Sequence, residues 1–402
     1  MRLRRWIPRL PIVLSAFAGL AGCATQVPRP ADTLTPTHAP SPTILPGATA
    51  SPTSEPARLI HVEIPAPSLK ANLLGDPALQ FLAISLPPSY FLSDRSYPVV
   101  YFLPGFGDDE RAFAYGDHGI VLARTVDAVM AQGSIRELIV VVVNGRNAAG
   151  GSFYVNSPVT GNWEDYVVQD VVPYVDRTHR TLALAASRGI AGHSMGGFGA
   201  LHLAMSHPET FGAVYALSPG LFAPGGLEDS QIFRDPVAND AFLAMIEELR
   251  GLDGEEAAAA FKTSLARLTG DQRFTLAYGM AFAPDVQAGP PYVDFPFERF
   301  GAELRRRSAA WARWEAGFGD LAAEVATNRQ ALSGLRGIGV DFGWAEENAW
   351  IPAGCLYFSD LLSDNRIPHR LVSFDGGHAN HLAERFHGAM LPFFSETLDF
   401  GP

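Results

Sequence analysis

Ser194 lies in a glycine-rich segment whose residue types and spacing suit nucleophilic chemistry. In this segment, Ile190–Ala200, apolar residues precede a Gly-x-Ser-x-Gly turn, and small or apolar residues follow it. A chain that turns sharply from a strand into a helix needs glycine there, because side chains would collide. Such a turn lifts a serine hydroxyl above a sheet. We therefore predict that Ser194 is a nucleophile, and not a buried serine in a plain turn.

An activated serine needs a base, and two late histidines are candidates. His378 follows the last predicted strand, 369–374, and two glycines before it give a loop that can bring an imidazole to the serine. His381 is the alternative, although we expect it to lie in the next helix. Because α/β folds place their chemistry at the carboxyl ends of strands, the predicted base is His378. We expect the side chain of His193 to point away from Ser194.

The base needs a carboxylate that orients it, and the loop after the predicted strand 337–342 supplies two. Glu346 and Glu347 both lie in this loop and both precede His378 in the chain. Asp341 is still within the strand, and Asp375 is too close to the histidine. We select Glu346 as the acid and keep Glu347 as the alternative.

An acyl-transfer site also needs backbone N–H groups that stabilise the oxyanion. Met195, directly after the nucleophile, is one predicted donor. Phe106 is the other, with Gly105 as its alternative, in the loop that follows the strand 98–103. Tyr154 and Asn156 follow the next buried strand, 138–143, and we expect them to line the substrate site.

The elements that must position these residues alternate along the chain. Apolar, β-branched runs indicate strands buried on both faces, and amphipathic segments lie between them. This alternation predicts an α/β fold with a mostly parallel sheet and helices on both faces. The predicted strands span 59–64, 79–86, 98–103, 138–143, 188–191, 212–217, 337–342 and 369–374, and helical spacing covers 110–132, 163–178, 353–363 and 381–398.

The alternation stops over residues 220–336. This stretch holds alanine-rich helical segments and an aromatic, proline-rich part. We interpret it as a cap inserted into a catalytic domain that spans 58–402, because no linker composition flanks it; an independent second domain is the alternative. Some of its aromatic side chains are expected to wall a pocket, although most aromatic residues in such a stretch belong to a core.

The amino terminus has the pattern of an export signal. Residues 1–22 combine four arginines with an apolar run too short to span a bilayer, and they end in Leu-Ala-Gly before Cys23. We expect cleavage before Cys23 and lipidation of its thiol, which would anchor the protein to the outer side of the membrane; an ordinary cleaved signal is the alternative. Residues 23–57, rich in Pro, Thr and Ser, read as a disordered tether. Cys355 then has no partner and is expected to be buried.

Composition narrows the remaining classes of function. The chain has 402 residues, 47% of them hydrophobic and 18% charged, and a formal net charge of −12. This charge argues against a nucleic-acid partner. His378 and His381 lie close together but lack a supporting cluster, so no metal site is predicted. No cofactor is expected, and the pattern says nothing about the oligomeric state.

Four segments together resemble the putative-esterase family of α/β-hydrolases, which includes feruloyl esterases, S-formylglutathione hydrolases and mycolyltransferases. They are Ser96–Gly105, Gly161–Tyr166, Ser187–Gly197 and Gly376–His378. The resemblance implies an α/β-hydrolase fold and a Ser–His–acid triad. The oxyanion loop departs from the family pattern because Pro104-Gly105 replaces His-Gly. The acid also departs, because Glu346 stands where an aspartate is common.

We therefore expect an exported serine esterase that acts on a small-molecule or carbohydrate ester through an acyl-enzyme. An acyltransferase that uses a sugar hydroxyl in place of water is one alternative. The alternative outside enzymes is a cell-surface binding protein on an inactive hydrolase fold.

Overall fold

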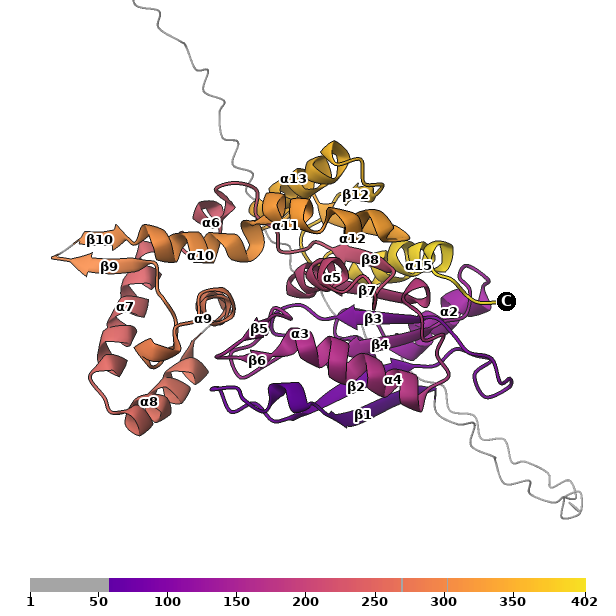
Figure 1. The fold of residues 1–402 in the computed structure, drawn as a ribbon, viewed down its shortest axis with the longest axis horizontal. Helices are drawn as coiled ribbons and strands as arrows, with labels where there is room; N and C mark the ends of the chain where they lie inside the picture. Colours follow the sequence, from indigo (N-terminus) through magenta and orange to yellow (C-terminus); the bar gives the residue numbers. More distant parts are fainter. Residues whose placement is uncertain (1–57, 269, 302) are drawn as a thin grey trace, which may run out of the picture. The chain divides into compact units, whose positions relative to one another are not determined.

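The computed structural model describes residues 58–402 except residues 269 and 302. The predicted signal peptide, Cys23 and tether lie outside the described residues. Figure 1 shows a twisted central sheet with helices on both faces. The sheet has eight strands in the order β1-β2-β4-β3-β7-β8-β11-β12. Their bounds are β1 Leu59–Pro65, β2 Leu79–Ser85, β3 Val99–Leu103, β4 Ile139–Val143, β7 Arg188–His193, β8 Ala213–Leu217, β11 Gly337–Gly343 and β12 Arg370–Phe374.

The six strands from β4 to β12 are parallel, whereas β2 is antiparallel to both of its neighbours. Parallel strands bring their carboxyl ends to one edge, so the loops after β3, β7, β11 and β12 meet there. The predicted α/β fold with a mostly parallel sheet is confirmed.

Side chains alternate between two hydrophobic cores, one on each face of the sheet. In β3, Val99, Tyr101 and Leu103 pack into one core, and Val100 and Phe102 pack into the other. This period of two explains why the strand is continuously apolar: both of its faces are buried. The first core contains residues of α4 (Val172–Thr178), α5 (Met195–Ser206) and α13 (Trp350–Asp364). The second core contains residues of α2 (Leu122–Ala131) and α15 (Leu391–Thr397).

Three predicted helical segments are interrupted. Residues 110–132 form α1 (Glu110–Tyr115) and α2, because Gly116 adopts φ 113°, a left-handed conformation that ends a helix. Each of the other two contains a π-helical stretch. One consists of α3 (Trp163–Asp165), η2 (Tyr166–Val171) and α4, and the other of α14 (Leu382–Arg385), η5 (Phe386–Met390) and α15.

The segment between β8 and β11 is helical apart from one small hairpin. Its elements are α6 Gly226–Asp229, α7 Pro236–Arg250, α8 Gly254–Arg267, α9 Gly270–Phe282, η4 Val286–Ala288, β9 Phe297–Phe300, β10 Glu303–Arg306, α10 Ser308–Gly319, α11 Leu321–Thr327 and α12 Arg329–Gly334. The sequence did not reveal the β9–β10 hairpin. In Figure 1, α7, α8 and the hairpin extend away from the sheet, while α11 and α12 pack against α13 and α5.

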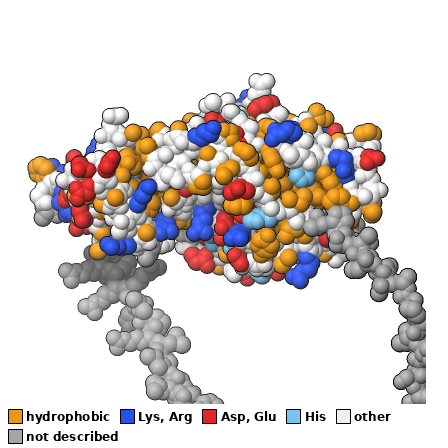
Figure 2. Space-filling model, turned by 90° about the horizontal axis from the view of Figure 1, so that it is seen from below, with side chains coloured by type: hydrophobic (Ala, Val, Ile, Leu, Met, Phe, Trp, Pro, Cys, Tyr) orange, Lys and Arg blue, Asp and Glu red, His pale blue; other side chains and the backbone are white. Residues whose placement is uncertain are grey.

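The insertion is held together by aromatic packing. Tyr278 and Trp314 are fully buried, with ring centroids 5.9 Å apart, and Phe318 lies 5.0 Å from the Tyr278 ring. Most of the aromatic residues therefore form a core, as the sequence suggested. Figure 2 shows acidic side chains grouped at the insertion's end of one face.

The remaining features of the fold are small. Cys355 on α13 is fully buried and free, as expected. None of the helices in the described part of the chain has the length and apolar character needed to cross a bilayer. The short pair of strands β5 (Asn156–Ser157) and β6 (Gly161–Asn162) and the helical turns η1 (Pro67–Leu69) and η3 (Ala185–Ser187) lie in connecting loops.

Candidate active site

Ser194 sits at the turn between β7 and α5 in a strained conformation. Its φ of 57° and ψ of −117° are rarely adopted by residues with a side chain. The turn is tight enough to require glycine on both sides: a Cβ on Gly196 would lie 1.9 Å from the carbonyl oxygen of Leu103, and one on Gly192 2.2 Å from that of Gly196. The Ser194 side chain is half-buried at the carboxyl edge of the sheet.

His378 and Glu346 contact each other across the loops that follow β12 and β11. The imidazole Nδ1 lies 2.9 Å from Glu346 Oε2, and the carboxylate is completely buried while the His378 side chain is 22% exposed. A carboxylate accepts, so Nδ1 carries the proton and Nε2 is left with a lone pair. This is the tautomer that a general base requires.

Glu347 holds the same loop in a different way. Its carboxylate accepts a hydrogen bond of 3.0 Å from the backbone N–H of His378. That hydrogen bond lowers the pKa of Glu347 below its ordinary value. The two adjacent glutamates are thus distinguished by position, because one contacts the imidazole and the other contacts the backbone.

His193 contacts His378 from the elbow side, which the sequence did not predict. Its Nε2 lies 3.1 Å from the backbone carbonyl oxygen of His378, and the two rings are 4.7 Å apart. Burial, and then the neighbouring His378, lower the pKa of His193 well below its usual value. The ring is therefore neutral and donates through Nε2–H. This contact places His378 beside the residue that precedes Ser194, although among the described residues no hydrogen bond joins Ser194 Oγ to the imidazole.

Phe106 and Met195, the predicted oxyanion donors, lie together next to the serine. A Cβ on Gly105 would be 3.5 Å from Ser194 Cβ, so the loop after β3 packs directly on the elbow. The side chains of Phe106 and Met195 both pack on Gly151, where a Cβ would approach them within 2.6 and 2.5 Å. The Met195 N–H opens α5 and has no intrahelical acceptor. It is therefore free to bind an anion.

The expectation that Tyr154 lines the substrate site is corrected. Tyr154 is fully buried and donates a hydrogen bond of 3.1 Å to the carbonyl oxygen of Pro104. It therefore supports the oxyanion loop from behind. Asn156 is exposed, and its amide contacts Asp165 at 3.1 Å. Phe153 and Tyr154 both have φ of 56°, which turns the Tyr154 side chain inward and could not be read from the sequence.

A buried ion pair lies beneath the histidine loop and was also missed. Arg385, on α14, binds Asp341 on β11, and their side chains are 7% and 2% exposed. The second guanidinium nitrogen, Nη1, lies 3.4 Å from the carbonyl oxygen of His378. Asp341 lies within its strand, as the sequence indicates, and it contacts Arg385 and not the imidazole.

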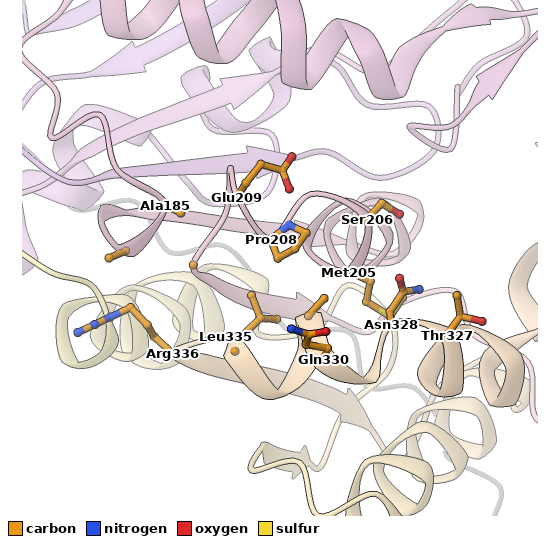
Figure 3. Close-up of a pocket in the computed structure, with 14 residues that line it drawn as sticks. Ala185, Met205, Ser206, Pro208, Glu209, Thr327, Asn328, Gln330, Leu335 and Arg336 are labelled. Carbon is orange, nitrogen blue, oxygen red and sulfur yellow. The ribbon is translucent and has the colours of Figure 1, made fainter.

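Three other features of the described residues lie outside this site. A hollow of about 850 Å³, drawn in Figure 3, lies at the amino ends of β7, β8 and β11, where Ala185, Leu335 and Arg336 line it. It is at the opposite edge of the sheet from Ser194 and does not belong to this site. His381 was expected in the last helix, but it precedes α14 as its N-cap, with φ 54°, and it is exposed. No group of three or more His, Cys, Asp or Glu side chains in the described part of the chain is arranged to hold a metal ion.

Part of the chain matches a known protein family. Residues 81–267 match the family described as Putative esterase. An esterase of Mycobacterium tuberculosis is 34% identical over 125 residues, which cover 31% of this chain and 25% of that protein. An endo-1,4-beta-xylanase/feruloyl esterase of Xylanibacter ruminicola is 28% identical over 134 residues, 33% of this chain and 18% of that protein. The matches thus span a quarter or less of these curated relatives.

A solved ferulic acid esterase has the same architecture. It superposes with a TM-score of 0.50 at 18% identity, over 85% of this chain and 98% of that chain. This likeness shows the α/β-hydrolase fold. The segment that matches the family includes the Ser194 elbow and the oxyanion loop. Residues 81–267 of the chain therefore match the Putative esterase family, and the chain has the fold of the α/β-hydrolases.

Proposed function

We propose that this protein is a serine esterase that hydrolyses carboxylic esters through an acyl-enzyme. His378 Nε2 takes the proton of the Ser194 hydroxyl while Oγ attacks the ester carbonyl. The N–H groups of Phe106 and Met195 stabilise the oxyanion of the tetrahedral intermediate. When this intermediate collapses, His378 passes the proton to the departing alcohol. Water, deprotonated by the same imidazole, then releases the acid and regenerates Ser194.

Glu346 has an orienting role in this reaction. It fixes the Nδ1–H tautomer of His378 and stabilises the imidazolium that forms during both steps. The observation that carries the proposal is the 2.9 Å contact between Glu346 and His378 beside a serine held at φ 57°. A binding protein would gain nothing from a strained serine, since strain costs stability.

The proposed substrates are esters of an acetyl or feruloyl type, including acylated carbohydrates. The names of the relatives support this class, because one of them is a feruloyl esterase. We also propose that the chain is exported and lipid-anchored through Cys23. Metabolic labelling with a radioactive fatty acid tests the anchor: wild type is expected to be labelled, and Cys23→Ala is not.

Activity is tested by assaying the purified chain on p-nitrophenyl acetate and methyl ferulate, together with Ser194→Ala. The variant is expected to lose at least about a thousandfold in kcat, because the nucleophile of a triad has no substitute. Ser206→Ala, at the far end of α5, is the matched control and should keep wild-type kcat. Turnover by Ser194→Ala equal to wild type would refute the mechanism.

A further inference from the structure

A tight turn in the loop after β4 packs against the loop that carries Phe106. The turn spans residues 147–151, and the N–H of Gly150 donates a hydrogen bond of 2.9 Å to the carbonyl oxygen of Asn147. Gly150 adopts φ 105°, a left-handed conformation that favours glycine. A Cβ at this position would lie 2.8 Å from Phe106 Cζ. The backbone of the turn is therefore in contact with a residue that the mechanism uses.

The side chain of Asn147 holds this turn from within. Asn147 is 6% exposed, and its Oδ1 accepts hydrogen bonds from the N–H groups of Ala149 and Gly151, at 3.0 and 3.1 Å. Because both partners are donors, the atom that faces them is the oxygen of the carboxamide. The Nδ2 group is buried and has no hydrogen-bond partner among the described residues. A buried donor without a partner lowers stability, so the contribution of this side chain comes from its oxygen.

The turn fixes the backbone next to the Phe106 N–H. The N–H of Gly107 donates a hydrogen bond of 2.9 Å to the carbonyl oxygen of Gly150. The preceding N–H, that of Phe106, has no acceptor among the described residues. Because peptide groups are planar, only φ and ψ of Phe106 separate these two N–H groups. Fixing the Gly107 N–H thus restricts the direction of the Phe106 N–H, which remains available to an oxyanion.

The turn also contacts the side chain of the second oxyanion donor, Met195. A Cβ on Gly151 would lie 2.5 Å from Met195 Sδ and 2.6 Å from Phe106 Cδ2. The side chains of both donor residues therefore pack on bare backbone at Gly151, whose N–H is bound by Asn147. Since a close-packed interior transmits displacements, a shift of this turn would move both donor residues.

We propose that Asn147 is a positioning residue of the oxyanion hole. Its Oδ1 holds the 147–151 turn, and this turn places the Phe106 N–H and supports Met195. The proposal rests on the esterase mechanism proposed above. Because the oxyanion forms only after Ser194 attacks the ester, a misplaced donor lowers kcat and leaves KM unchanged. A displacement of about 1 Å is enough for a loss of about a hundredfold.

The test replaces Asn147 in the full-length protein. Asn147→Ala removes the acceptor, and kcat on p-nitrophenyl acetate is expected to fall about ten- to a hundredfold with KM unchanged. Asn147→Asp keeps an oxygen that can accept from both N–H groups, and it loses only an Nδ2 group that has no partner among the described residues. It is therefore expected to keep kcat within about threefold of wild type, although its buried second oxygen lowers Tm.

Inhibition by phenylboronic acid gives a second measurement that does not depend on turnover. Its tetrahedral adduct with the Ser194 hydroxyl places an oxygen in the oxyanion hole, so its affinity should follow the stabilisation of the transition state. The inhibition constant is expected to rise about tenfold or more in Asn147→Ala and to stay near wild type in Asn147→Asp. If Asn147→Ala fails to fold, Asn147→Ser carries the test, because a hydroxyl can accept from the nearby Ala149 N–H but is too short to bind that of Gly151 as well.

Asn239→Ala is the matched control. Asn239, on α7, is 4% exposed, donates through Nδ2 to the carbonyl oxygen of Phe233 at 3.0 Å, and has a buried Oδ1 without a partner among the described residues. This variant should lower Tm and leave kcat unchanged. An Asn147→Ala variant that does the same overturns the proposal, as does an equal loss of kcat in Asn147→Asp. Activity retained by Ser194→Ala instead overturns the proposed function.

Discussion

Arg385 connects the buried carboxylate of Asp341 to the backbone of His378. One guanidinium nitrogen, Nη2, binds Asp341 and lies 3.0 Å from Ser218 Oγ, while Nη1 lies 3.4 Å from the His378 carbonyl oxygen. The Arg385 side chain thus holds both β11, which leads to Glu346, and the loop that carries His378. His193 donates to the same carbonyl from the elbow side at 3.1 Å. The histidine is thus fixed through its backbone as well as through its ring.

Arg385→Lys should slow catalysis more than it weakens folding. Lysine can keep the charge pairing with Asp341, but it cannot also reach the His378 carbonyl, because it lacks the planar fork of donors. We expect kcat on p-nitrophenyl acetate to fall about tenfold with KM unchanged. Arg385→Met, which leaves a buried carboxylate unpaired, should cost about 3–5 kcal/mol of unfolding free energy. Steady-state kinetics and urea unfolding measure the two effects. An unchanged kcat in Arg385→Lys would mean that the pair is only structural.

The two glutamates of the β11 loop should respond differently to amide substitution. Glu346→Gln replaces the acceptor of the Nδ1 proton and favours the wrong tautomer of His378, so kcat should fall about 10³- to 10⁴-fold. Glu347→Gln keeps an oxygen that can accept the His378 N–H, so a loss of about tenfold or less is expected. Each of these two variants is the matched control for the other, because the two glutamates are adjacent in the same loop. A larger loss in Glu347→Gln would transfer the orienting role to that residue.

The pattern of the sequence was enough to predict the order of the site along the chain. The elbow is a local signal: glycine spacing, a preceding strand and a following helix lie within one short segment around Ser194. His378 could be placed because it follows the last strand. The alternating strands also fixed the fold class, since buried parallel strands and amphipathic helices have different periods.

Contacts that depend on loop conformation or on distant residues could not be predicted. Glu346 and Glu347 are equivalent in composition, and only the backbone of their loop decides which one faces the imidazole. Arg385 and Asp341 are 44 residues apart, so no local pattern pairs them. Tyr154 points inward because two consecutive residues adopt positive φ, a conformation that residues with side chains rarely adopt.

Tyr154→Phe should impair the oxyanion loop. The substitution removes the hydroxyl that donates to the Pro104 carbonyl at 3.1 Å, and it leaves that acceptor without this partner. We expect kcat to fall about five- to tenfold and the unfolding free energy to drop by about 1–3 kcal/mol.

Tyr166→Phe is the matched control for this change. Tyr166 is also fully buried, and its hydroxyl has no hydrogen-bond partner among the described residues. Removing the Tyr166 hydroxyl should therefore change kcat and the unfolding free energy only slightly. If both variants lose activity equally, the hydrogen bond to Pro104 has no special role.

Glu164 and its histidine partners should make the free energy of unfolding depend on pH. Their contribution should fall below about pH 4.5 and above about pH 6.5. It accepts from His202 at 3.0 Å and from His207 at 2.7 Å. The hydrogen bonds from these two residues lower the pKa of Glu164 to about 2, and the hydrogen bond to Glu164 raises the pKa of His207 above 6.5. A lowered carboxyl pKa gives stability that is present above pH 4.5 and lost as the pH falls toward 2. A raised histidine pKa gives stability that is present below pH 6.5 and lost as the pH rises through the raised value.

The contribution of the cluster should thus be greatest between about pH 4.5 and 6.5. Since the three side chains are about 20% exposed, solvent screens the interaction, and we expect it to amount to about 1 kcal/mol. Glu164→Gln should therefore lower Tm most in that window and least near pH 9, where His207 is neutral. Glu209→Gln, which removes only the longer contact of 3.4 Å to His207 Nδ1, is the control and should change Tm less. Parallel Tm curves for wild type and Glu164→Gln across the whole range would show that the charges of this cluster do not contribute to folding.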